Sequence, residues 1–171
     1  MYAVSEIVSR ADRLVKKYGT RNPYDIAREV GIELRMCDFH RQRGAYKVIM
    51  RNRFVFINQN LDPVMQRIVL LHELGHDSLH RTEATRLGGF QEFNIFNMAN
   101  NRMEYEANVF ASQIELDDGE FLEYCERGWD TQQIAAAMDS DINLIALKAD
   151  TMISRGFRLR RQEHRNDFLK I

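Results

Sequence analysis

Hydrophobic residues recur at helical spacing in the first thirty residues of the chain. Apolar side chains three and four positions apart predict one helix from Ser5 to Gly19, because glycine commonly follows the last turn of a helix. A shorter helix is predicted from Pro23 to Val30, since proline is favoured in a first helical turn. The chain therefore opens with two amphipathic helices.

The pattern changes after Gly31, where β-branched and aromatic residues become frequent. Three stretches predict strands, with a turn at 51–53 between the last two: Ile32–Met36, Ala45–Met50 and Phe54–Asn58. Their short connections favour a small antiparallel sheet.

Helical spacing returns in the second half. The predicted elements are a helix from Pro63 to about His80, a connection over 81–101 with a possible strand at Phe90–Phe96, a helix over Met103–Ile114, an acidic helix from Asp118, and a helix-turn-helix unit over Thr131–Met152. The fold class predicted from these elements is α+β.

Composition removes several classes of protein. No apolar run approaches the roughly 20 residues that cross a bilayer, and the charged first thirty residues contain no secretory signal. Two cysteines are too few for a disulfide framework, which favours the cytoplasm. Charge is uneven: residues 71–150 carry 5 basic and 16 acidic side chains, whereas residues 1–70 carry 13 and 7. An acidic middle region suits a cation or a basic polypeptide partner.

A metal-binding motif lies in the long predicted helix, in the sequence Leu-His-Glu-Leu-Gly-His over 71–76. Residues four apart project from one helical face, so His72 and His76 can bind one ion. Imidazole nitrogens suit Zn²⁺, and a catalytic zinc site needs a third protein ligand and an open position. Glu73, beside the first ligand, can serve as general base toward an activated water.

The third ligand is expected from the next helix, where Glu104 and Glu106 are the candidates. About 200° of helical rotation separates them, so only one can face the ion. Glu104 shares its stripe with Ala107 and Asn108, and small side chains there allow close helix packing, which favours Glu104. Asn108 could also hydrogen-bond the free ring nitrogen of a ligating histidine.

His80 follows His76 by four residues and lies too far along the helix for the same ion. We expect it to cap the helix or to hydrogen-bond a ligand, with a surface position as the alternative. The group that stabilises the transition state is not defined by any motif. Tyr46, His40 and Tyr105 remain open for that role.

The paired motifs LHELGHDSLH and MEYEANVFASQIEL resemble the ImmA/IrrE family of zinc metallopeptidases, whose second motif has the form Glu-x-x-Ala-Asn. The resemblance spans about residues 5–155 and implies that His72, His76 and Glu104 bind zinc and that Glu73 is the base. It also implies a zincin-like core over 1–116, a helix-turn-helix-like segment over 117–155 packed on it, and an Arg-rich tail over 156–171.

The resemblance further implies the reaction: a limited cut in a helix-turn-helix transcriptional repressor, of the kind made by family members from phages and mobile elements. We expect one strand of the hairpin Ala45–Asn58 to lie at the cleft as an exposed edge for the substrate. Two alternatives use residues 131–152 instead: a DNA-binding regulator, or a catalytically silent partner-docking protein. The second predicted helix of that segment is nearly neutral, so nucleic acid is an unlikely partner.

Overall fold

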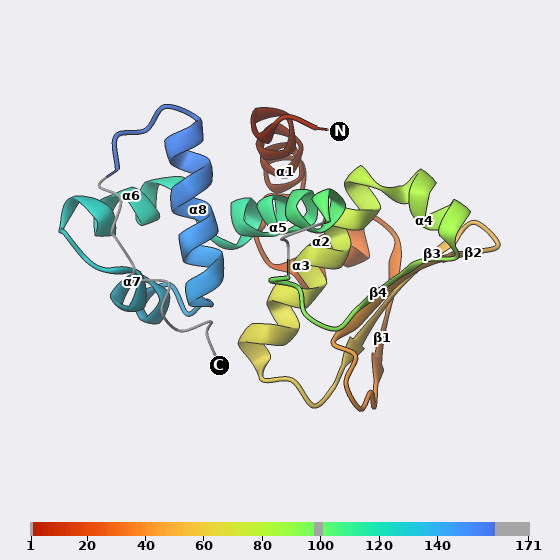
Figure 1. Ribbon diagram of the computed structural model, residues 1–171. Coiled ribbons are helices and arrows are strands. Elements are labelled where there is room, and N and C mark those ends of the chain that lie inside the picture. Colours follow the sequence, from red (N-terminus) through yellow and green to blue (C-terminus); the bar gives the residue numbers. More distant parts are fainter. Residues whose placement is uncertain (1, 98–100, 160–171) are drawn as a thin grey trace.

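The computed structural model describes residues 2–97 and 101–159, and in this part of the chain it has eight helices and a mixed sheet of four strands. The sheet lies on one side of the long helix α3, and α6–α8 lie on the other (Figure 1). The helices are α1 Val4–Tyr18, α2 Pro23–Glu29, α3 Pro63–Leu79, α4 Arg81–Leu87, α5 Arg102–Glu115, α6 Asp118–Glu126, α7 Thr131–Ala137 and α8 Ile142–Ser154. The strands are β1 Ile32–Cys37, β2 Gly44–Ile49, β3 Asn52–Asn58 and β4 Phe90–Glu92. The α+β class is confirmed.

The sheet order is β1-β3-β2-β4, and β1 runs parallel to β3 rather than pairing with β2. The expectation of an antiparallel sheet is therefore wrong for this pair. Asn58, at the end of β3, gives a physical reason: its amide donates to the carbonyls of Phe39 and Gln42. These bonds fold the 38–43 connection over the end of β3, so β2 pairs with the opposite side of β3.

Both strands of the predicted hairpin are interior, which corrects the expectation that one of them forms the exposed edge. β2 pairs antiparallel with β3 and, at 44–46, with β4. β4 is shorter than the predicted strand Phe90–Phe96, because the Glu92 side chain accepts from the amide of Asn94 and turns the chain. The predicted connection before it contains helix α4. β4 is thus the sheet edge nearest the metal motif.

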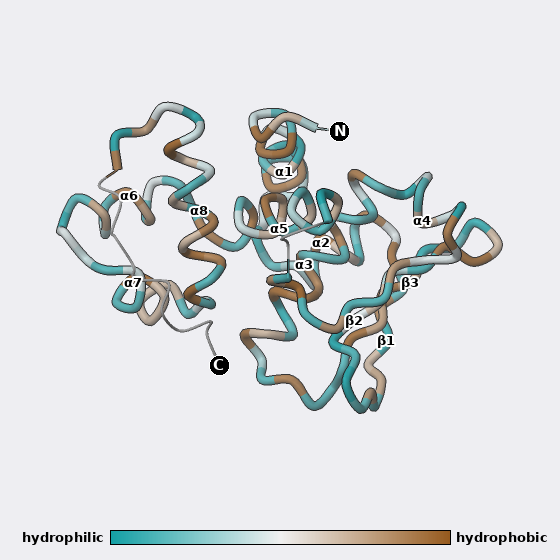
Figure 2. The backbone as a smooth tube through the Cα atoms, in the orientation of Figure 1, coloured by the Kyte–Doolittle hydropathy of each residue, from teal (hydrophilic) through white to brown (hydrophobic). Residues whose placement is uncertain are grey.

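Helix α3 occupies the centre of the molecule. Asp62 caps its first turn by accepting from the amide of Met65, and Pro63 fills the first helical position. Its residues 68–71 are buried, and the brown colour of α3 in Figure 2 marks hydrophobic residues. A Cβ on Gly75 would lie 2.9 Å from Ala107 Cα, so α3 and α5 approach as closely as backbones allow. That contact brings the start of α5 to the two histidines.

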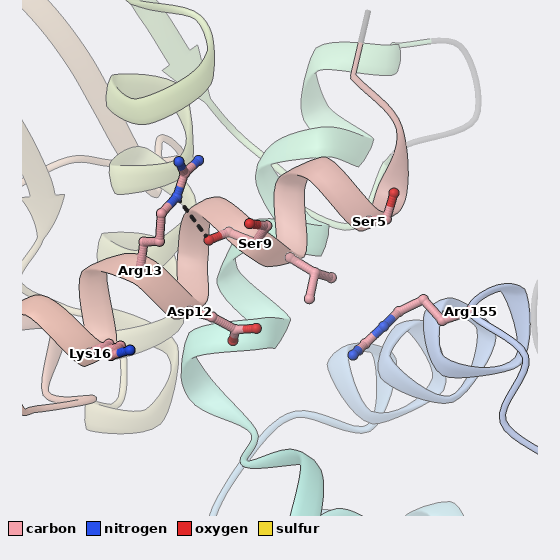
Figure 3. Close-up of a pocket in the computed structure, with 7 residues that line it drawn as sticks. Ser5, Ser9, Asp12, Arg13, Lys16 and Arg155 are labelled. Atoms are coloured by element: carbon pink, nitrogen blue, oxygen red, sulfur yellow. Dashed lines mark hydrogen bonds between the residues drawn. The ribbon is translucent and has the colours of Figure 1, made fainter.

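The C-terminal helices attach to the other end of α5. Lys148 of α8 is fully buried, and its ammonium donates to Gln113 Oε1 (2.7 Å) and to Asp118. Gln113 also donates to Asp12 of α1 at 2.8 Å. Figure 3 shows Asp12 and Arg155 on opposite walls of a surface pocket of about 350 Å³ between α1 and the end of α8.

No helix among the described residues is long and apolar enough to span a bilayer. The predicted Arg-rich tail is described only as far as Leu159, and the rest of that prediction lies outside the described residues.

Candidate metal centre

Two histidines of α3 point their Nε2 atoms at one place. His72 and His76 are one turn apart, and their Nε2 atoms are 3.0 Å from each other. Both rings are buried, with exposed fractions of 0% and 1%. Two ring nitrogens held this closely, away from water, need a shared proton or a cation between them.

Glu104, in the first turn of α5, completes the group. Its Oε2 lies 3.0 Å from His72 Nε2 and 3.5 Å from His76 Nε2. Ligands about 2.05 Å from a tetrahedral zinc would be about 3.3 Å apart, close to these separations. Glu104 Oε2 is also buried without a hydrogen-bond partner. Among the described residues, these three side chains are the group that could hold a metal ion.

The opposite nitrogen of His72 contacts the amide side chain of Asn108. The distance from His72 Nδ1 to Asn108 Oδ1 is 3.0 Å, and the Asn108 amide donates in turn to the carbonyl of Ile95. An N–H on Nδ1 would therefore donate to Asn108, leaving the Nε2 lone pair directed at the Glu104 carboxylate. Asn108 fixes which ring nitrogen is available for an ion.

His76 has a different support, a histidine and a carboxylate in series. His76 Nδ1 lies 3.1 Å from His80 Nδ1, and His80 Nε2 lies 3.0 Å from Glu106 Oε2. Glu106 is buried and also accepts from Arg102 Nε and from the amide of Tyr2. The structure thus separates the two carboxylates: Glu104 faces the histidine pair and Glu106 faces His80, which is buried and not on the surface.

Glu73 lies beside the histidine pair, and both of its carboxylate oxygens are buried without a hydrogen-bond partner. Burial raises the pKa of Glu73 to about 8, with the nearby carboxylates of Glu92 and Glu104 adding to the effect against the opposing charge of His72. Gly44 of β2 makes room for this side chain, because a Cβ there would lie 2.7 Å from Glu73 Oε1. Glu73 is therefore a buried carboxyl group without a hydrogen-bond partner, and a cation bound beside it would favour its ionised, proton-accepting form.

The electrostatics show how strongly the three carboxylates act on the histidines. Burial alone would lower the pKa of His72, but its contacts with Glu104 and Glu92 raise it to about 10. Burial lowers the pKa of His76 to about 4. Burial opposes ionisation of Glu104, yet the two histidines hold its pKa well below the usual range. The site favours a positive charge at its centre, which a metal cation would supply.

Strand β4 adds two residues that were not among the predicted site residues. Phe90 and Glu92 face α3: the Phe90 ring stacks on His76 with centroids 4.4 Å apart, and Glu92 Oε2 lies 3.6 Å from His72 Nε2. The two residues are two apart in a strand, which places them on one face. A strand of three residues inside a long polar connection carries too little periodicity to reveal them, and the alternation of Phe90 and Glu92 was the only signal.

The three open candidates for the transition-state donor lie in different places. Tyr46 is fully buried, and its hydroxyl donates to Asp77 at 2.6 Å, so it is committed elsewhere. Burial, together with Asp150 of α8, raises the pKa of Tyr105. His40 is exposed in the connection before β2.

A helix with two facing histidines and an adjacent glutamate, an acidic third ligand from helix α5 and a small mixed sheet together define a zincin-like metallopeptidase. The model of the peptidase M78 family, the IrrE N-terminal-like domain, matches residues 27–139, and the chain belongs to this family. It is 33% identical over 143 residues to "Uncharacterized immunity region protein 2" of Bacillus phage phi105, covering 83% of this chain and 88% of that one. It is 30% identical over 141 residues to "Metallopeptidase ImmA" of Bacillus subtilis (strain 168), covering 80% and 79%.

Proposed function

We propose that this protein is a zinc-dependent endopeptidase that makes a limited cut in a helix-turn-helix repressor. The observation that carries the proposal is the group of His72, His76 and Glu104, whose three ligand atoms converge in a buried place beside an unpartnered carboxylate. Three protein ligands and one free position are what a catalytic zinc site requires. The name of the phage relative, an immunity region protein, and that of the bacterial relative, a metallopeptidase, support a peptidase activity connected with an immunity region.

His72, His76 and Glu104 would hold the ion, which when bound polarises a carbonyl and lowers the pKa of water. Glu73 then acts as the general base. Its free carboxylate accepts a proton as a water oxygen forms a bond to the scissile carbonyl carbon. The same proton passes from Glu73 to the leaving nitrogen as the C–N bond breaks. The products are one new carboxyl terminus and one new amino terminus, and Glu73 returns to its starting state.

Strand β4 is the element that we expect to bind the substrate backbone. It is an edge of the sheet, and an extended peptide can add to such an edge through main-chain hydrogen bonds. These bonds select no sequence, so docking of a folded part of the repressor must supply specificity. Helix α6 could provide that dock, because Glu120, Glu123 and Glu126 are exposed there and suit a basic DNA-binding protein.

We place this reaction in the cytoplasm, where a transcriptional repressor acts and where free thiols persist. Both cysteines, Cys37 and Cys125, are free in the structure.

Function as a DNA-binding regulator is disfavoured by the position of Lys148. Lys148 lies in the second helix of the helix-turn-helix-like segment, where it is the cation that could contact a phosphate. It is instead buried against Gln113 and Asp118. Contacts to phosphate need exposed Lys or Arg side chains. Helix α8 packs against α5 with the face that carries Lys148, so this lysine is not available to contact DNA.

The test combines the repressor encoded beside the gene with wild-type protein and the Glu73→Gln variant. We expect one discrete, chelator-sensitive cut by the wild type. Glu73→Gln should retain metal and lose hydrolysis by at least about a hundredfold, because general-base catalysis commonly contributes 10²–10⁴-fold. Casein is the control substrate. Rapid casein degradation with an intact repressor would contradict the limited cut, and wild-type cleavage by Glu73→Gln would remove Glu73 as the base.

A further inference from the structure

The approach to the metal centre is covered by a segment that we call the strap, residues 88–97, which contains β4. The strap enters through Gly88 and Gly89, both with positive φ. A Cβ on Gly89 would lie 2.6 Å from the carbonyl oxygen of Tyr46, so the strap lies directly against β2. Figure 1 shows β4 passing along the sheet beside α3. Its inner face carries Phe90 and Glu92 onto the two histidines.

The backbone on both sides of Glu92 is fixed. The amide of Arg43 donates to the Glu92 carbonyl at 2.7 Å, and the Ile95 carbonyl accepts from the side chain of Asn108. The Glu92 side chain is also held on one side, because its Oε1 accepts from the amide of Asn94 at 2.6 Å. Its other oxygen, Oε2, is directed at His72. A strap anchored in this way holds one carboxylate oxygen next to the ligand atoms.

The burial of the site shows that this arrangement cannot accommodate a peptide. His72, Glu73 and His76 have exposed fractions of 0%, 0% and 1%, and the side chains of Glu104 and Glu92 are 14% and 11% exposed. A substrate carbonyl must come within contact distance of Glu73 and the ion for hydrolysis to occur. The strap therefore has to move before the substrate binds.

We propose that Glu92 is a fourth ligand that occupies the open position of the metal ion in the resting enzyme, and that it leaves this position when the strap is displaced by a substrate strand. The 3.6 Å between Glu92 Oε2 and His72 Nε2 is close to the separation expected of two ligands on one tetrahedral ion. Glu92 lies outside the group of three whose ligand atoms are all within 4.8 Å of one another, so its side chain has to turn toward the ion to become a ligand. A second carboxylate ligand would also neutralise a divalent cation already bound by Glu104. This inference rests on the proposed function, since it assumes that an ion binds at the centre.

The consequence for specificity is direct. An enzyme whose open position is filled by its own side chain is inactive toward peptides that cannot displace the strap. A partner whose strand pairs with the outer edge of β4 would pull the strap, and Glu92 with it, away from the ion and present a scissile bond in the same event. Limited cleavage then follows from the strap and needs no narrow pocket for side chains.

Cobalt-substituted protein tests the proposal, because the absorption bands of Co²⁺ report its ligands directly. The variants are Glu92→Gln and Glu92→Ala, with Gln91→Ala as the matched control, since Gln91 is exposed on the opposite face of the same strand. Azide serves as a small ligand for the open position. If Glu92 fills that position nine-tenths of the time, both Glu92 variants should bind azide about tenfold more tightly than the wild type. Their resting spectra should also change, and Gln91→Ala should match the wild type in both measurements.

Three results would overturn the proposal. Equal azide affinities in wild type and Glu92 variants would show that Glu92 does not compete for the open position. Tighter azide binding with an unchanged resting spectrum would reduce Glu92 to a nearby negative charge. A change of the same size in Gln91→Ala would assign the effect to the strand as a whole. Failure of the wild type itself to bind one Co²⁺ per chain would instead refute the metal centre on which the proposed function depends, so the two failures are distinguishable.

Discussion

Helix α5 carries two buried polar clusters, one at each end, and they differ in one respect. The metal cluster consists of Glu104 with the two histidines and Glu73 of α3, and three of its carboxylate oxygens are buried without hydrogen-bond partners. The lysine cluster consists of Gln113, Asp118 and Lys148, and its ammonium pairs directly with both neighbours. The ammonium of the lysine cluster has two hydrogen-bond partners, whereas the metal cluster leaves carboxylate oxygens without any.

The difference separates a structural cluster from a functional one. A buried charge is tolerated when a partner of opposite sign is built into the chain, as Lys148 is for Asp118. Unpartnered buried carboxylates are costly, and a chain that retains them implies a group that arrives from outside. Burial shifts both clusters in the expected direction: it lowers the pKa of Lys148 and raises that of Glu73. The carboxylate oxygens without a hydrogen-bond partner, rather than burial itself, distinguish the metal cluster.

The largest effect is expected when the metal cluster loses a ligand. Glu104→Gln should weaken Zn²⁺ affinity by more than about a hundredfold, because loss of a residue that merely supports a ligand already costs about 10–100-fold. Chelator competition measures this affinity. Glu106→Gln is the matched control on the same helix and should cost about tenfold or less, since Glu106 acts only through His80. The reverse order would move the ligand to Glu106.

A change in the lysine cluster should affect folding stability and not metal affinity. Lys148→Ala leaves Asp118 and Gln113 without their cation and should lower the free energy of unfolding by about 2 kcal/mol, a figure reduced because Asp118 is partly exposed. Lys148→Met should cost less, since it restores the buried volume. Urea unfolding of the metal-loaded protein provides the values. Both variants should bind the metal with the wild-type affinity. A lower metal affinity in either variant would mean that the two clusters are energetically coupled.

The contacts behind the histidines provide a finer test. Asn108→Ala removes the acceptor at His72 Nδ1 and should weaken metal binding by about 10–100-fold. Asn108→Asp, which keeps an oxygen there, should retain more affinity than Asn108→Ala. Isothermal titration with Zn²⁺ would show the order, and equal affinities for all three proteins would mean that Asn108 does not orient His72.

The last prediction concerns the pH dependence of the metal-free protein. The unfolded chain releases the Glu73 proton near its ordinary pKa of 4.5, whereas the folded protein keeps it to about pH 8. Between these values the folded state binds more protons, so stability falls as pH rises. Glu73→Gln should therefore show a shallower fall in melting temperature from pH 5 to pH 8. Parallel curves for the two proteins would mean that Glu73 ionises normally.

Several features of the centre follow from sequence spacing. The spacing of four positions from His72 to His76 fixes their common face, and the small residues after Glu104 anticipate the contact between Gly75 and Ala107. The position of Glu92 could not be derived, because it depends on β4 pairing with β2 across some forty intervening residues. The parallel pairing of β1 with β3 skips the intervening strand β2 and is accompanied by the bonds of the Asn58 side chain to the 38–43 connection, which no periodicity reveals.

The lysine cluster shows a second limit of the sequence. Lys148 belongs to the helix-turn-helix-like segment whose second helix is nearly neutral, and lysine is seldom buried, so the sequence does not predict its buried position. Its partners Gln113 and Asp118 lie about thirty residues away, so nothing local to α8 announces the contact. The pattern of hydrophobic and polar residues within one helix predicts a buried charge poorly when the opposite charge comes from another helix.

The contact between Gly75 and the backbone of Ala107 also makes the distance between two helices depend on a single hydrogen atom. Replacing that hydrogen by a methyl group, in Gly75→Ala, would force α5 away from α3 and move Glu104 with it, although residue 75 contacts no ion. A library that varies only positions 75 and 107 would therefore sample the width of the centre while every donor group stayed in place. Such a series offers protein engineers a way to select among cations of different radius.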